Sequence, residues 1–502
     1  MNNLYKTALI ILIINIVGCS NANKNVKTVE NKSKQPNILW IVVEDLNPVF
    51  SCYGETINPT PTLDNLAKSG VLFKNAYTPA PVCSAARSAF ITSTMPTTFG
   101  LHNHHSSRTV EDAIFLPEGV KTIPEVFKEN GYQTFNHGKD DYNFIYDRKK
   151  LYEDDIQTDF WYTFSGTGDW LGKLSPDQPF FGQIQLEGGK LGLIQVYDKI
   201  KDKITPIDRS LVQLPPYYPN IPSVHEDFAR HYDAARATDL EVEEIINQLK
   251  EKGLLNNTYV FFFADHGYKG IRHKQFLYDG GIQIPLIVAY FGEDSQIKQQ
   301  TVREDLVSGI DIGTSSLALA GINIPKYMEG QNMFDSNFKR DFIIATRDRC
   351  DFSIDRIRAV RTDKYKYIKN YMPNRSYTQP AYRDRRAEFV DIKKMFDEGK
   401  LNDVQAKYWL PTKPEEELYD LENDPFEINN LAYDANYSSE INKLRTILNN
   451  WAETYGDKGS EPQNIYSLKF MYERWGERCV NEEFDTVKNM EIHNAPKVAI
   501  KK

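Results

Sequence analysis

The sequence predicts an α/β fold, with a large sheet covered by helices on both sides and a smaller α+β domain at the C-terminal end. From Pro36 to about residue 335, apolar β-branched runs alternate with segments of helical period, which is the pattern of a sheet flanked by helices. Beyond that point the chain becomes basic, aromatic and rich in turns. A chain of 502 residues exceeds what one ordinary core needs, so we expect a main domain at 36–335 and a smaller one at 336–502.

Each expected element has its own local signal. Short apolar runs predict strands at 37–43, 132–135, 179–186, 259–264 and 285–290. Helical spacing of apolar residues predicts helices at 62–69, 84–94, 122–130, 226–252, 307–321 and 438–455. Gly70, Gly131 and Gly253 follow three of these helices, and glycine commonly ends a helix. The proline-rich segment 190–222 is expected to be irregular.

The N-terminal residues predict export. Lys6 precedes an apolar run over 7–18, which has the length of a signal peptide and is too short to cross a bilayer. The run ends in Ile16-Val17-Gly18-Cys19, which resembles the bacterial lipobox, whose cysteine receives lipid and becomes the new N-terminus. We therefore expect a lipoprotein signal peptide at 1–18, a lipid anchor at Cys19 in a membrane of the cell envelope, on the outer membrane or cell surface, and a tether at 19–35. A plain signal peptide with an incidental cysteine is the alternative.

Composition narrows the classes of partner. The net charge of −9 argues against a nucleic-acid partner, because phosphate binding relies on lysine and arginine. A polyanionic substrate therefore needs a local basic pocket. Beside Cys19 and Cys83, three further cysteines remain, Cys52, Cys350 and Cys479. An odd remainder gives no basis for a disulfide framework.

Two pairs of polar residues follow predicted strands. Glu44-Asp45 come directly after 37–43, and Asp265-His266 come directly after 259–264. In open α/β sheets, ligands bind beyond the carboxyl ends of the strands, so both pairs stand where chemistry is expected. Capping of a helix or turn is the alternative for these carboxylates.

The most informative stretch is Cys83-Ser84-Ala85-Ala86-Arg87, at the start of a predicted helix. It has the pattern Cys-x-Ala-x-Arg and stands among other characteristic segments. These segments are 36–38, 60–67 and 73–77 before it, 131–134, 138–139, 265–267, 274 with 278–279, and 285–287 after it, and 360–367 and 417–425 in the second domain. Together they resemble the type I sulfatase family of the alkaline-phosphatase-like superfamily, over nearly all of the chain from Pro36 to about Ala432.

The resemblance implies a fold and an activity. The fold is a large mixed sheet between helices, as the catalytic domain, with a smaller C-terminal subdomain. The activity is hydrolysis of sulfate esters, with Cys83 oxidised by a maturase to formylglycine (3-oxoalanine), whose hydrate attacks sulfur and later expels sulfate. Placing residue 83 at a helix start aims backbone N–H groups at the sulfate anion.

The resemblance also implies roles for the residues around Cys83. Arg87, one helical turn later, faces the same side and contacts the nucleophilic oxygen, while Lys139 and Lys274 bind sulfate as point charges. The family uses Ca²⁺, a cation that favours oxygen ligands and withdraws charge from the sulfate. The matching ligands are Glu44, Asp45, Cys83, Asp265 and His266.

Several positions depart from the family pattern. The family commonly has two aspartates where Glu44-Asp45 stand, and it usually has histidine where Asp141 stands. The strand 179–186 leads to Glu187-Gly188-Gly189-Lys190 in place of a histidine-rich turn. The corresponding role, as sulfate ligand or leaving-group acid, falls to Lys190, His225 or His273, and the three remain open.

The expected substrate is a sulfated carbohydrate, because export and anchoring suit the digestion of an extracellular polysaccharide. An algal glycan such as ulvan comes first and a glycosaminoglycan next. Two other functions remain open. Phosphodiester and phosphonate hydrolases share this fold, and turnover of aryl phosphate against aryl sulfate separates them. The unusual Asp141 and Gly188-Gly189 also fit a catalytically silent lipoprotein that binds glycans.

Overall fold

Residues 35–153, 174–175 and 178–490 are described by the computed structural model. The expected signal peptide 1–18, the expected anchor Cys19 and the expected tether up to residue 34 lie outside these ranges. Within the described ranges, no helix combines the length and the apolar character needed to span a membrane.

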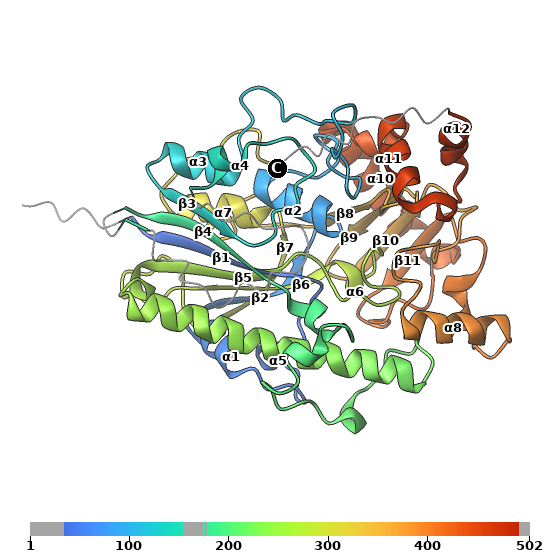
Figure 1. Ribbon diagram of the computed structural model, residues 1–502, viewed down its shortest axis with the longest axis horizontal. Helices are drawn as coiled ribbons and strands as arrows, with labels where there is room; N and C mark the ends of the chain where they lie inside the picture. The colour runs from blue at the N-terminus through green and yellow to red at the C-terminus, as the bar shows by residue number, and fades with distance from the viewer. Residues whose placement is uncertain (1–34, 154–173, 176–177, 491–502) are drawn as a thin grey trace, which may run out of the picture. The chain divides into compact units, whose positions relative to one another are not determined.

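A seven-stranded mixed sheet forms the centre of the molecule (Figure 1). In spatial order its strands are β3 (Gln133–His137), β4 (Phe180–Leu186), β1 (Asn37–Val43), β5 (Thr258–Ala264), β6 (Gln283–Ala289), β2 (Gly70–Tyr77) and β7 (Thr301–Ser308). Strands β3, β4, β1 and β5 are parallel, and β6 runs antiparallel to both of its neighbours. The predicted α/β fold with a large mixed sheet is confirmed.

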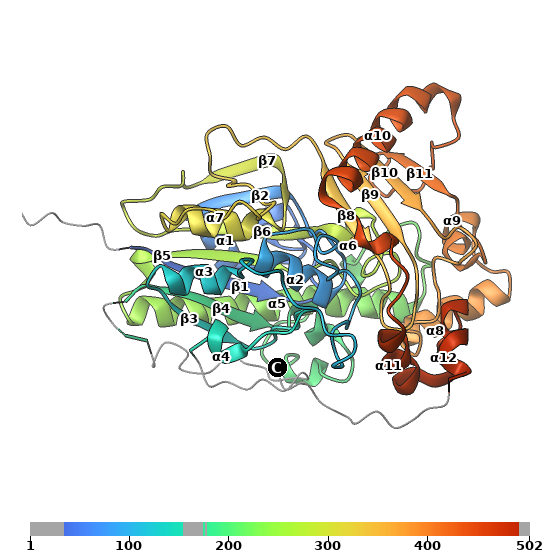
Figure 2. The ribbon, with the colours of Figure 1, turned by 90° about the horizontal axis from the view of Figure 1, so that it is seen from above.

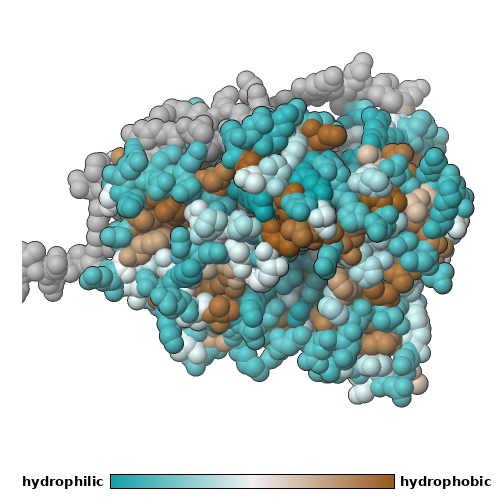
Figure 3. Space-filling view, turned by 90° about the horizontal axis from the view of Figure 1, so that it is seen from below, coloured by the Kyte–Doolittle hydropathy of each residue, from teal (hydrophilic) through white to brown (hydrophobic). Residues whose placement is uncertain are grey.

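Helices cover both faces of this sheet (Figure 1). One face carries α2 (Cys83–Thr92), α3 (Ile123–Glu129) and α7 (Asp311–Leu319), and the other carries α1 (Pro61–Lys68) and α5 (Pro222–Glu251). Every residue of β1, β4 and β5 is therefore buried, as expected for parallel strands covered on both sides. Figure 3 shows the molecule from the side of α1 and α5, where hydrophilic residues cover most of the surface.

A smaller antiparallel sheet lies beside the main sheet (Figure 2). Its order is β11 (Glu416–Asp420), β10 (Tyr365–Asn370), β9 (Ile357–Arg361) and β8 (Ile343–Arg347). Helix α10 (Ser438–Tyr455) packs on this sheet, and Leu444 of the helix shares an apolar cluster with Val360 of β9 and Ala89 of α2. The smaller sheet therefore supports the helix that begins at Cys83. Contacts between the two sheets make the described chain from Gln35 onward one compact unit.

Six further α-helices belong to the described chain. They are α4 (Arg148–Leu151), α6 (Asp279–Ile282), α8 (Ala387–Asp397), α9 (Asp403–Ala406), α11 (Ile465–Trp475) and α12 (Asp485–Lys488). Of these, α11 and α12 lie at the C-terminal end, next to the smaller sheet (Figure 2).

Most expected elements agree with the structure to within a few residues. Strand β1 and helix α10 have the predicted bounds. Helix α5 begins earlier than expected, at Pro222, because proline is favourable at the first helical position. The predicted helix 307–321 is wrong at its start. Val307 and Ser308 pair with β2 as the end of β7, and the helix itself is α7.

Candidate active site

Two strand ends bring the predicted metal ligands together. Strands β1 and β5 are neighbouring parallel strands in register to their last residues, so Glu44-Asp45 and Asp265-His266 leave the sheet side by side. All four residues are buried. The backbone N–H groups of Asp45 and His266 both donate to Asp265 Oδ1, at 3.1 and 2.9 Å. The first of these hydrogen bonds ties the turn after β1 to the turn after β5, and the second fixes the Asp265 side chain within its own turn.

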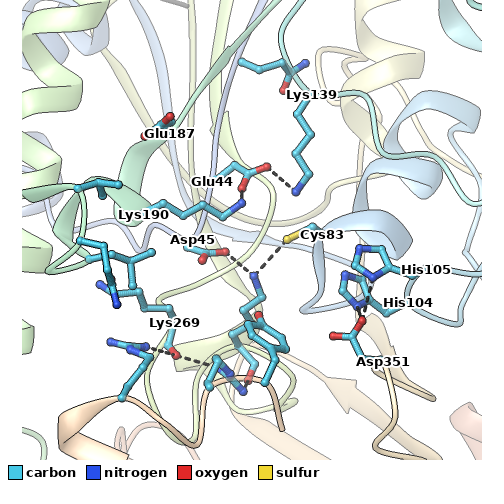
Figure 4. Close-up of a pocket in the computed structure, with 18 of the residues that line it drawn as sticks. Glu44, Asp45, Cys83, His104, His105, Lys139, Glu187, Lys190, Lys269 and Asp351 are labelled. Atoms are coloured by element: carbon cyan, nitrogen blue, oxygen red, sulfur yellow. Dashed lines mark hydrogen bonds and ion pairs between the residues drawn. The ribbon is translucent and has the colours of Figure 1, made fainter. Parts of the chain in front are cut away.

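Cys83 faces the strand ends from the start of α2 (Figure 4). The extended backbone of Val82 precedes the helix, and Cys83 is 4% exposed. Its Sγ lies 3.3 Å from His266 Nε2 and 3.1 Å from Lys274 Nζ. The helix start, an imidazole and an ammonium group therefore meet at this one side chain.

The donor atoms around Cys83 fit a hard divalent cation. Potential ligand atoms lie within 4.8 Å of one another in two overlapping groups, Asp45 with Cys83 and His266, and Glu44 with Cys83 and Asp265. Three carboxylates and one imidazole make a mainly oxygen site, which suits calcium or magnesium better than zinc. Buried carboxylates this close together repel one another unless positive charge compensates them.

Arg87 supplies part of this compensation. Its Nε lies 3.3 Å from Asp265 Oδ2 and its Nη2 lies 3.0 Å from Glu44 Oε1. Its Nη1 also donates to Gln185 Oε1 on β4. Arg87 is 4% exposed, and its two carboxylate partners are both proposed ligands. Its contacts are therefore those of a residue that positions the two carboxylates.

Three lysines reach the same site from the walls of a cavity of about 600 Å³ (Figure 4). Lys274 Nζ lies 2.7 Å from Asp45 Oδ1, and Lys139 Nζ lies 2.7 Å from Glu44 Oε1. Lys190 forms an ion pair with Glu44 Oε2. The cavity has the size of a pocket for an organic ligand, so it has room for a ligand larger than a sulfate group.

The lysines set the charge state of the site. Burial alone would raise the pKa of the Cys83 thiol, but the ammonium groups of Lys139 and Lys274 hold this pKa well below its usual value. The pKa of Lys274 is raised well above its usual value, because Asp45 and Cys83 outweigh the effect of burial. Burial, with Lys274 acting in the same direction, lowers the pKa of Lys190 to about 7, while its pairing with Glu44 opposes this shift. The pKa values of Lys190 and Lys274 are therefore shifted in opposite directions, toward neutral pH for Lys190 and away from it for Lys274.

Two glycines let the chain after β4 pass close to the end of β1. A Cβ on Gly189 would lie 2.0 Å from the backbone oxygen of Asp45, and a Cβ on Gly188 would lie 2.2 Å from Val43 Cγ1. Gly188 also has a φ of +49°, in the left-handed region that favours glycine. The Gly188-Gly189 pair therefore allows the close approach that brings Lys190 to the proposed metal ligands.

Asp141, which departs from the family pattern, lies beside Lys139. Its Oδ2 lies 3.4 Å from Lys139 Nζ, and its Oδ1 lies 2.8 Å from Arg108 Nη2. The residue is 1% exposed. This position therefore contributes a buried carboxylate between two cations rather than an imidazole.

His225 and His273 are not brought into the site. The described lining of the cavity contains neither residue. His225 lies in the first turn of α5 and pairs with Asn220. His273 is buried, with its Nε2 3.2 Å from Tyr217 Oη and its Nδ1 3.0 Å from Gly280 O. Of the three candidates for the sulfate-ligand or leaving-group role, the structure brings Lys190 to the described lining of the cavity and places His225 and His273 outside it.

The cavity also contains residues that sequence reasoning missed. His104, His105 and Asp351 line it on the side of Cys83 away from Lys190 (Figure 4). The sequence carries a signal for the histidines, because three of the nine in the chain fall within 102–105. Asp351 follows β8 in the second sheet, and no motif in the sequence marks it.

Comparison with known proteins assigns the chain to a family. The family model Sulfatase matches residues 36–322, and the model N-sulphoglucosamine sulphohydrolase, C-terminal, matches residues 266–412. An ulvan-active sulfatase of Formosa agariphila is 30% identical over 510 residues, which cover 92% of this chain and 83% of that protein. The N-acetylgalactosamine-6-sulfatase of Homo sapiens is 26% identical over 346 residues, 59% of this chain and 65% of that enzyme.

Solved structures share the fold. A 2-O GAG sulfatase superposes with a TM-score of 0.62 at 22% identity, covering 84% of this chain and 93% of that one. A phosphonate monoester hydrolase from Silicibacter pomeroyi gives a TM-score of 0.60 at 14% identity, covering 85% and 97%. The fold is thus common to two chemistries, but the family model spans more than half of the chain and the Formosa relative aligns with nearly all of it. The chain therefore belongs to the type I sulfatases of the alkaline-phosphatase-like superfamily, and it is a sulfuric ester hydrolase.

Proposed function

We propose that this sulfatase removes sulfate from a sulfated carbohydrate, using a formylglycine formed from Cys83 and a Ca²⁺ ion held by Glu44, Asp45, Asp265 and His266. The observation that carries the proposal is the position of Cys83. It stands at the start of α2, 3.1 Å from Lys274 Nζ and 3.3 Å from His266 Nε2, in the wall of the cavity. A structural thiol has no need of these polar neighbours.

The residues of the chain supply binding and orientation. When present, formylglycine supplies a hydroxyl nucleophile that can later release the sulfate, and Ca²⁺ supplies positive charge to the sulfate oxygens. Lys274, between Asp45 and Cys83, holds a sulfate oxygen from one side, and Lys139 does so from the side of Glu44. The start of α2 adds the partial positive charge of its free N–H groups. Arg87 keeps the carboxylates oriented throughout.

Lys190 is our candidate for the leaving-group acid. It lines the cavity, whereas the described positions of His225 and His273 are outside it. With a pKa lowered to about 7 by burial, Lys190 is close to the value that suits a general acid at neutral pH. Its Nζ gives a proton to the sugar oxygen as the S–O bond breaks, and the sugar leaves as an alcohol.

The substrate we propose is an algal polysaccharide of the ulvan kind, or oligosaccharides from it. Three curated relatives from Formosa agariphila, 24–30% identical to this chain, carry the name ulvan-active sulfatase. The cavity volume of about 600 Å³ supports a substrate with at least one sugar ring beyond the sulfate.

Mass spectrometry of the peptide that contains Cys83, together with an assay of sulfate release, tests the proposal. We expect an aldehyde at residue 83 in active protein and no sulfate release from Cys83→Ala. Cys52→Ala, which removes a partly buried thiol outside the cavity lining, serves as the matched control and retains activity. An unmodified thiol in fully active protein contradicts the mechanism.

The same assay separates the other functions. Faster turnover of an aryl phosphate than of the matching aryl sulfate would assign the site to phosphoryl chemistry. Binding of sulfated oligosaccharide without sulfate release, and without any effect of a calcium chelator, would identify a glycan-binding protein that has lost catalysis.

We also propose that the mature protein is anchored to the cell envelope through lipid on Cys19. The lipobox-like residues before Cys19 support this, and two or more acyl chains give a stable anchor where one does not. In cells that process lipoproteins, the wild type should partition with membranes and Cys19→Ser should not. Equal partitioning of both proteins would count against the anchor.

A further inference from the structure

One wall of the cavity contains a group of residues that the proposed sulfate chemistry does not use. His104, His105 and Asp351 lie across Cys83 from Lys190 (Figure 4). The Nδ1 atoms of His104 and His105 lie 3.3 and 2.8 Å from Asp351 Oδ1. The two imidazole rings are stacked, with centroids 3.6 Å apart. All three side chains are thereby fixed in one orientation at the edge of the cavity.

The backbone of this group is strained and tied to the catalytic helix. His105 has a φ of 55° and Asp351 a φ of 51°, values in the left-handed region that residues with a Cβ rarely adopt. The His105 N–H donates to Ser84 Oγ at 3.1 Å, and the His104 N–H donates to Arg349 O at 2.9 Å. The group is therefore tied to the start of α2, because Ser84 directly follows Cys83.

His104 brings a positive charge to this wall. Burial alone would lower its pKa, but Asp351, followed by Cys350, raises it well above the usual value. His105 has its pKa lowered to about 3, by burial and then by His104. At neutral pH the group is therefore an imidazolium, a neutral imidazole and a carboxylate. The imidazolium can donate a charged hydrogen bond to a ligand.

The C-terminal end of α11 completes this side of the cavity. Arg474 and Trp475 both line it, and Arg474 is exposed. The guanidinium lies 5.4 Å from the ring centroid of Trp475, and no carboxylate among the described residues forms an ion pair with it. Trp475 packs against Phe352, at a centroid distance of 4.9 Å, and against the guanidinium of Arg478. A fixed aromatic ring beside an unpaired guanidinium suits a sugar ring that carries an anion.

The charge of the cavity lining also favours an anionic ligand. Its lining has seven lysine and arginine side chains against four carboxylates, although the chain has a net charge of −9. Two of the four carboxylates, Glu44 and Asp45, are proposed metal ligands. Lys269 and Arg386 pair with Asp227, outside this lining, whereas Arg474 has no carboxylate partner among the described residues, so a cation beside Trp475 is available to a second anionic group of the substrate.

We propose that Arg474, Trp475 and His104, oriented by Asp351, form a subsite for the sugar unit next to the sulfated one, and that this subsite selects a unit carrying a carboxylate. The planar guanidinium of Arg474 pairs with the two carboxylate oxygens. Trp475 packs on the sugar face, and His104 donates a hydrogen bond to the same unit. The inference rests on the proposed function and deepens it, because it defines the substrate as a sulfated saccharide that contains a uronic acid.

Three disaccharides that share one sulfated sugar test this inference. In the first the neighbouring unit has a carboxylate, in the second that carboxylate is reduced to an alcohol, and in the third it is replaced by a second sulfate ester. For the wild type we expect kcat/KM to be highest for the carboxylate, through a lower KM. In Arg474→Gln, the ratio of kcat/KM for the carboxylate to that for the alcohol should fall about tenfold, the factor that corresponds to about 1.4 kcal/mol.

Controls separate this subsite from a general effect of charge or folding. Lys488→Gln removes one positive charge from α12, outside the cavity lining, and should leave both the activity and the ratio unchanged. Arg474→Lys keeps the charge but loses the planar fork, so it should restore only part of the ratio. Calorimetric binding of the desulfated uronate disaccharide to Cys83→Ala protein gives a readout that does not depend on turnover, and Arg474→Gln in that background should weaken it.

The outcomes distinguish failure of the inference from failure of the proposed function. Release of sulfate from all three disaccharides with one kcat/KM, unchanged in Arg474→Gln, overturns the subsite and leaves the sulfatase proposal intact. A preference for the second sulfate over the carboxylate overturns the choice of carboxylate. Sulfate release from none of them, with normal folding and an aldehyde at residue 83, removes the proposed substrate class itself.

Discussion

The residue at position 45 has an unusual backbone conformation and a proposed role as a metal ligand. Asp45 has a φ of 52°, which asparagine tolerates better than most residues. Asp45→Asn therefore removes the charge while keeping the turn. We expect Ca²⁺ to raise the melting temperature of the wild type after treatment with a chelator, by a stabilisation of about 2.7 kcal/mol at a hundredfold excess over Kd. In Asp45→Asn this increase should be much smaller.

Asp64→Asn provides the matched control for the calcium measurement. Asp64 accepts a hydrogen bond from Ser51 outside the cavity lining, so its replacement should leave the calcium-dependent shift unchanged. An equal shift in Asp45→Asn and the wild type would count against Asp45 as a ligand.

Arg87 and Lys74 show how burial changes the contribution of an ion pair. The pairs of Arg87 with Glu44 and Asp265 are almost fully buried, whereas Lys74 and Glu304 form a pair with side chains 49% and 72% exposed. In Arg87→Met, Glu44 keeps its pairs with Lys139 and Lys190, but the fully buried Asp265 loses its arginine, which costs about 3–5 kcal/mol. Lys74→Met should cost less than about 1 kcal/mol. Urea unfolding of the two variants in chelator measures the difference, and equal losses would contradict this account.

Sequence motifs predicted most of the residues that meet at the site. The remaining residues are brought there by contacts between distant parts of the chain, which no motif reveals. Glu44, Asp45 and Asp265 could be predicted because each follows a strand directly, and parallel neighbours end at one edge of a sheet. His273 could not be assigned from sequence, because its distance from the motifs does not reveal that its nitrogens bind Tyr217 and Gly280. Asp351 could not be found at all, since only the folded chain brings it to His104.

At the scale of elements, the turn after β4 carries the strictest steric requirement near the site. Gly189→Ala would place a Cβ 2.0 Å from the backbone oxygen of Asp45, so either β1 or the turn has to move. We expect sulfate release to fall by at least about a hundredfold, because shifts of about 1 Å in catalytic groups have effects of this size. Gly119→Ala adds backbone strain, because Gly119 has a φ of +82°, but no atom lies within 4 Å of its new Cβ, so this control should lose some stability and retain activity. Full activity in Gly189→Ala would show that the turn can yield without moving Asp45.

Elements with a single clear pattern were predictable, and elements defined by their partners were not. Strand β1 is seven buried residues, and α10 has a regular apolar spacing, so both bounds followed from the sequence. Strand β2 was missed because Lys74 and Asn75 interrupt its apolar residues, and a bulge against both neighbours accommodates them. Strand β7 was missed altogether, since Arg303 and Glu304 give no strand pattern without β2 beside them, and its last two residues were assigned to a helix.

At the scale of the whole molecule, Glu241 on α5 should make stability depend on pH. Burial, then the nearby carboxylates Glu187 and Glu244, raise its pKa from 4.5 to about 8. Between these two pKa values the folded protein keeps a proton on Glu241 that the unfolded chain has lost. Glu241 therefore stabilises the fold at low pH. Its contribution declines as the pH rises from 4.5 to about 8. In Glu241→Gln the decline is absent, and the variant should gain stability over the wild type between pH 5 and pH 8.

Urea unfolding at pH 5 and pH 8 measures this gain, which amounts to as much as about 1.4 kcal/mol for each pKa unit of the shift. Glu243→Gln alters an exposed neighbour on the same helix and should show no difference between the two pH values. A constant difference between Glu241→Gln and the wild type at both pH values would contradict the raised pKa.

The arrangement of the two sheets was the least predictable part of the molecule. The sequence becomes basic, aromatic and rich in turns after about residue 335, which indicated a second region. It did not indicate that Ala89 of α2 shares a core with β9 and α10. That contact links residues from distant parts of the chain, and its strength depends on shape as much as on hydrophobicity. The sequence therefore predicted that a second sheet region exists, while the way it supports Cys83 required the structure.

The burial of Cys83 limits when an enzyme can reach it. Once folded, the residue is 4% exposed, and the cavity beside it is lined by residues as late in the chain as Trp475. Because synthesis proceeds from the N-terminus, Cys83 leaves the ribosome well before β8–β11 and α11 have been made. The proposed oxidation therefore belongs to the nascent or unfolded chain, and slower folding should leave a larger fraction of molecules converted.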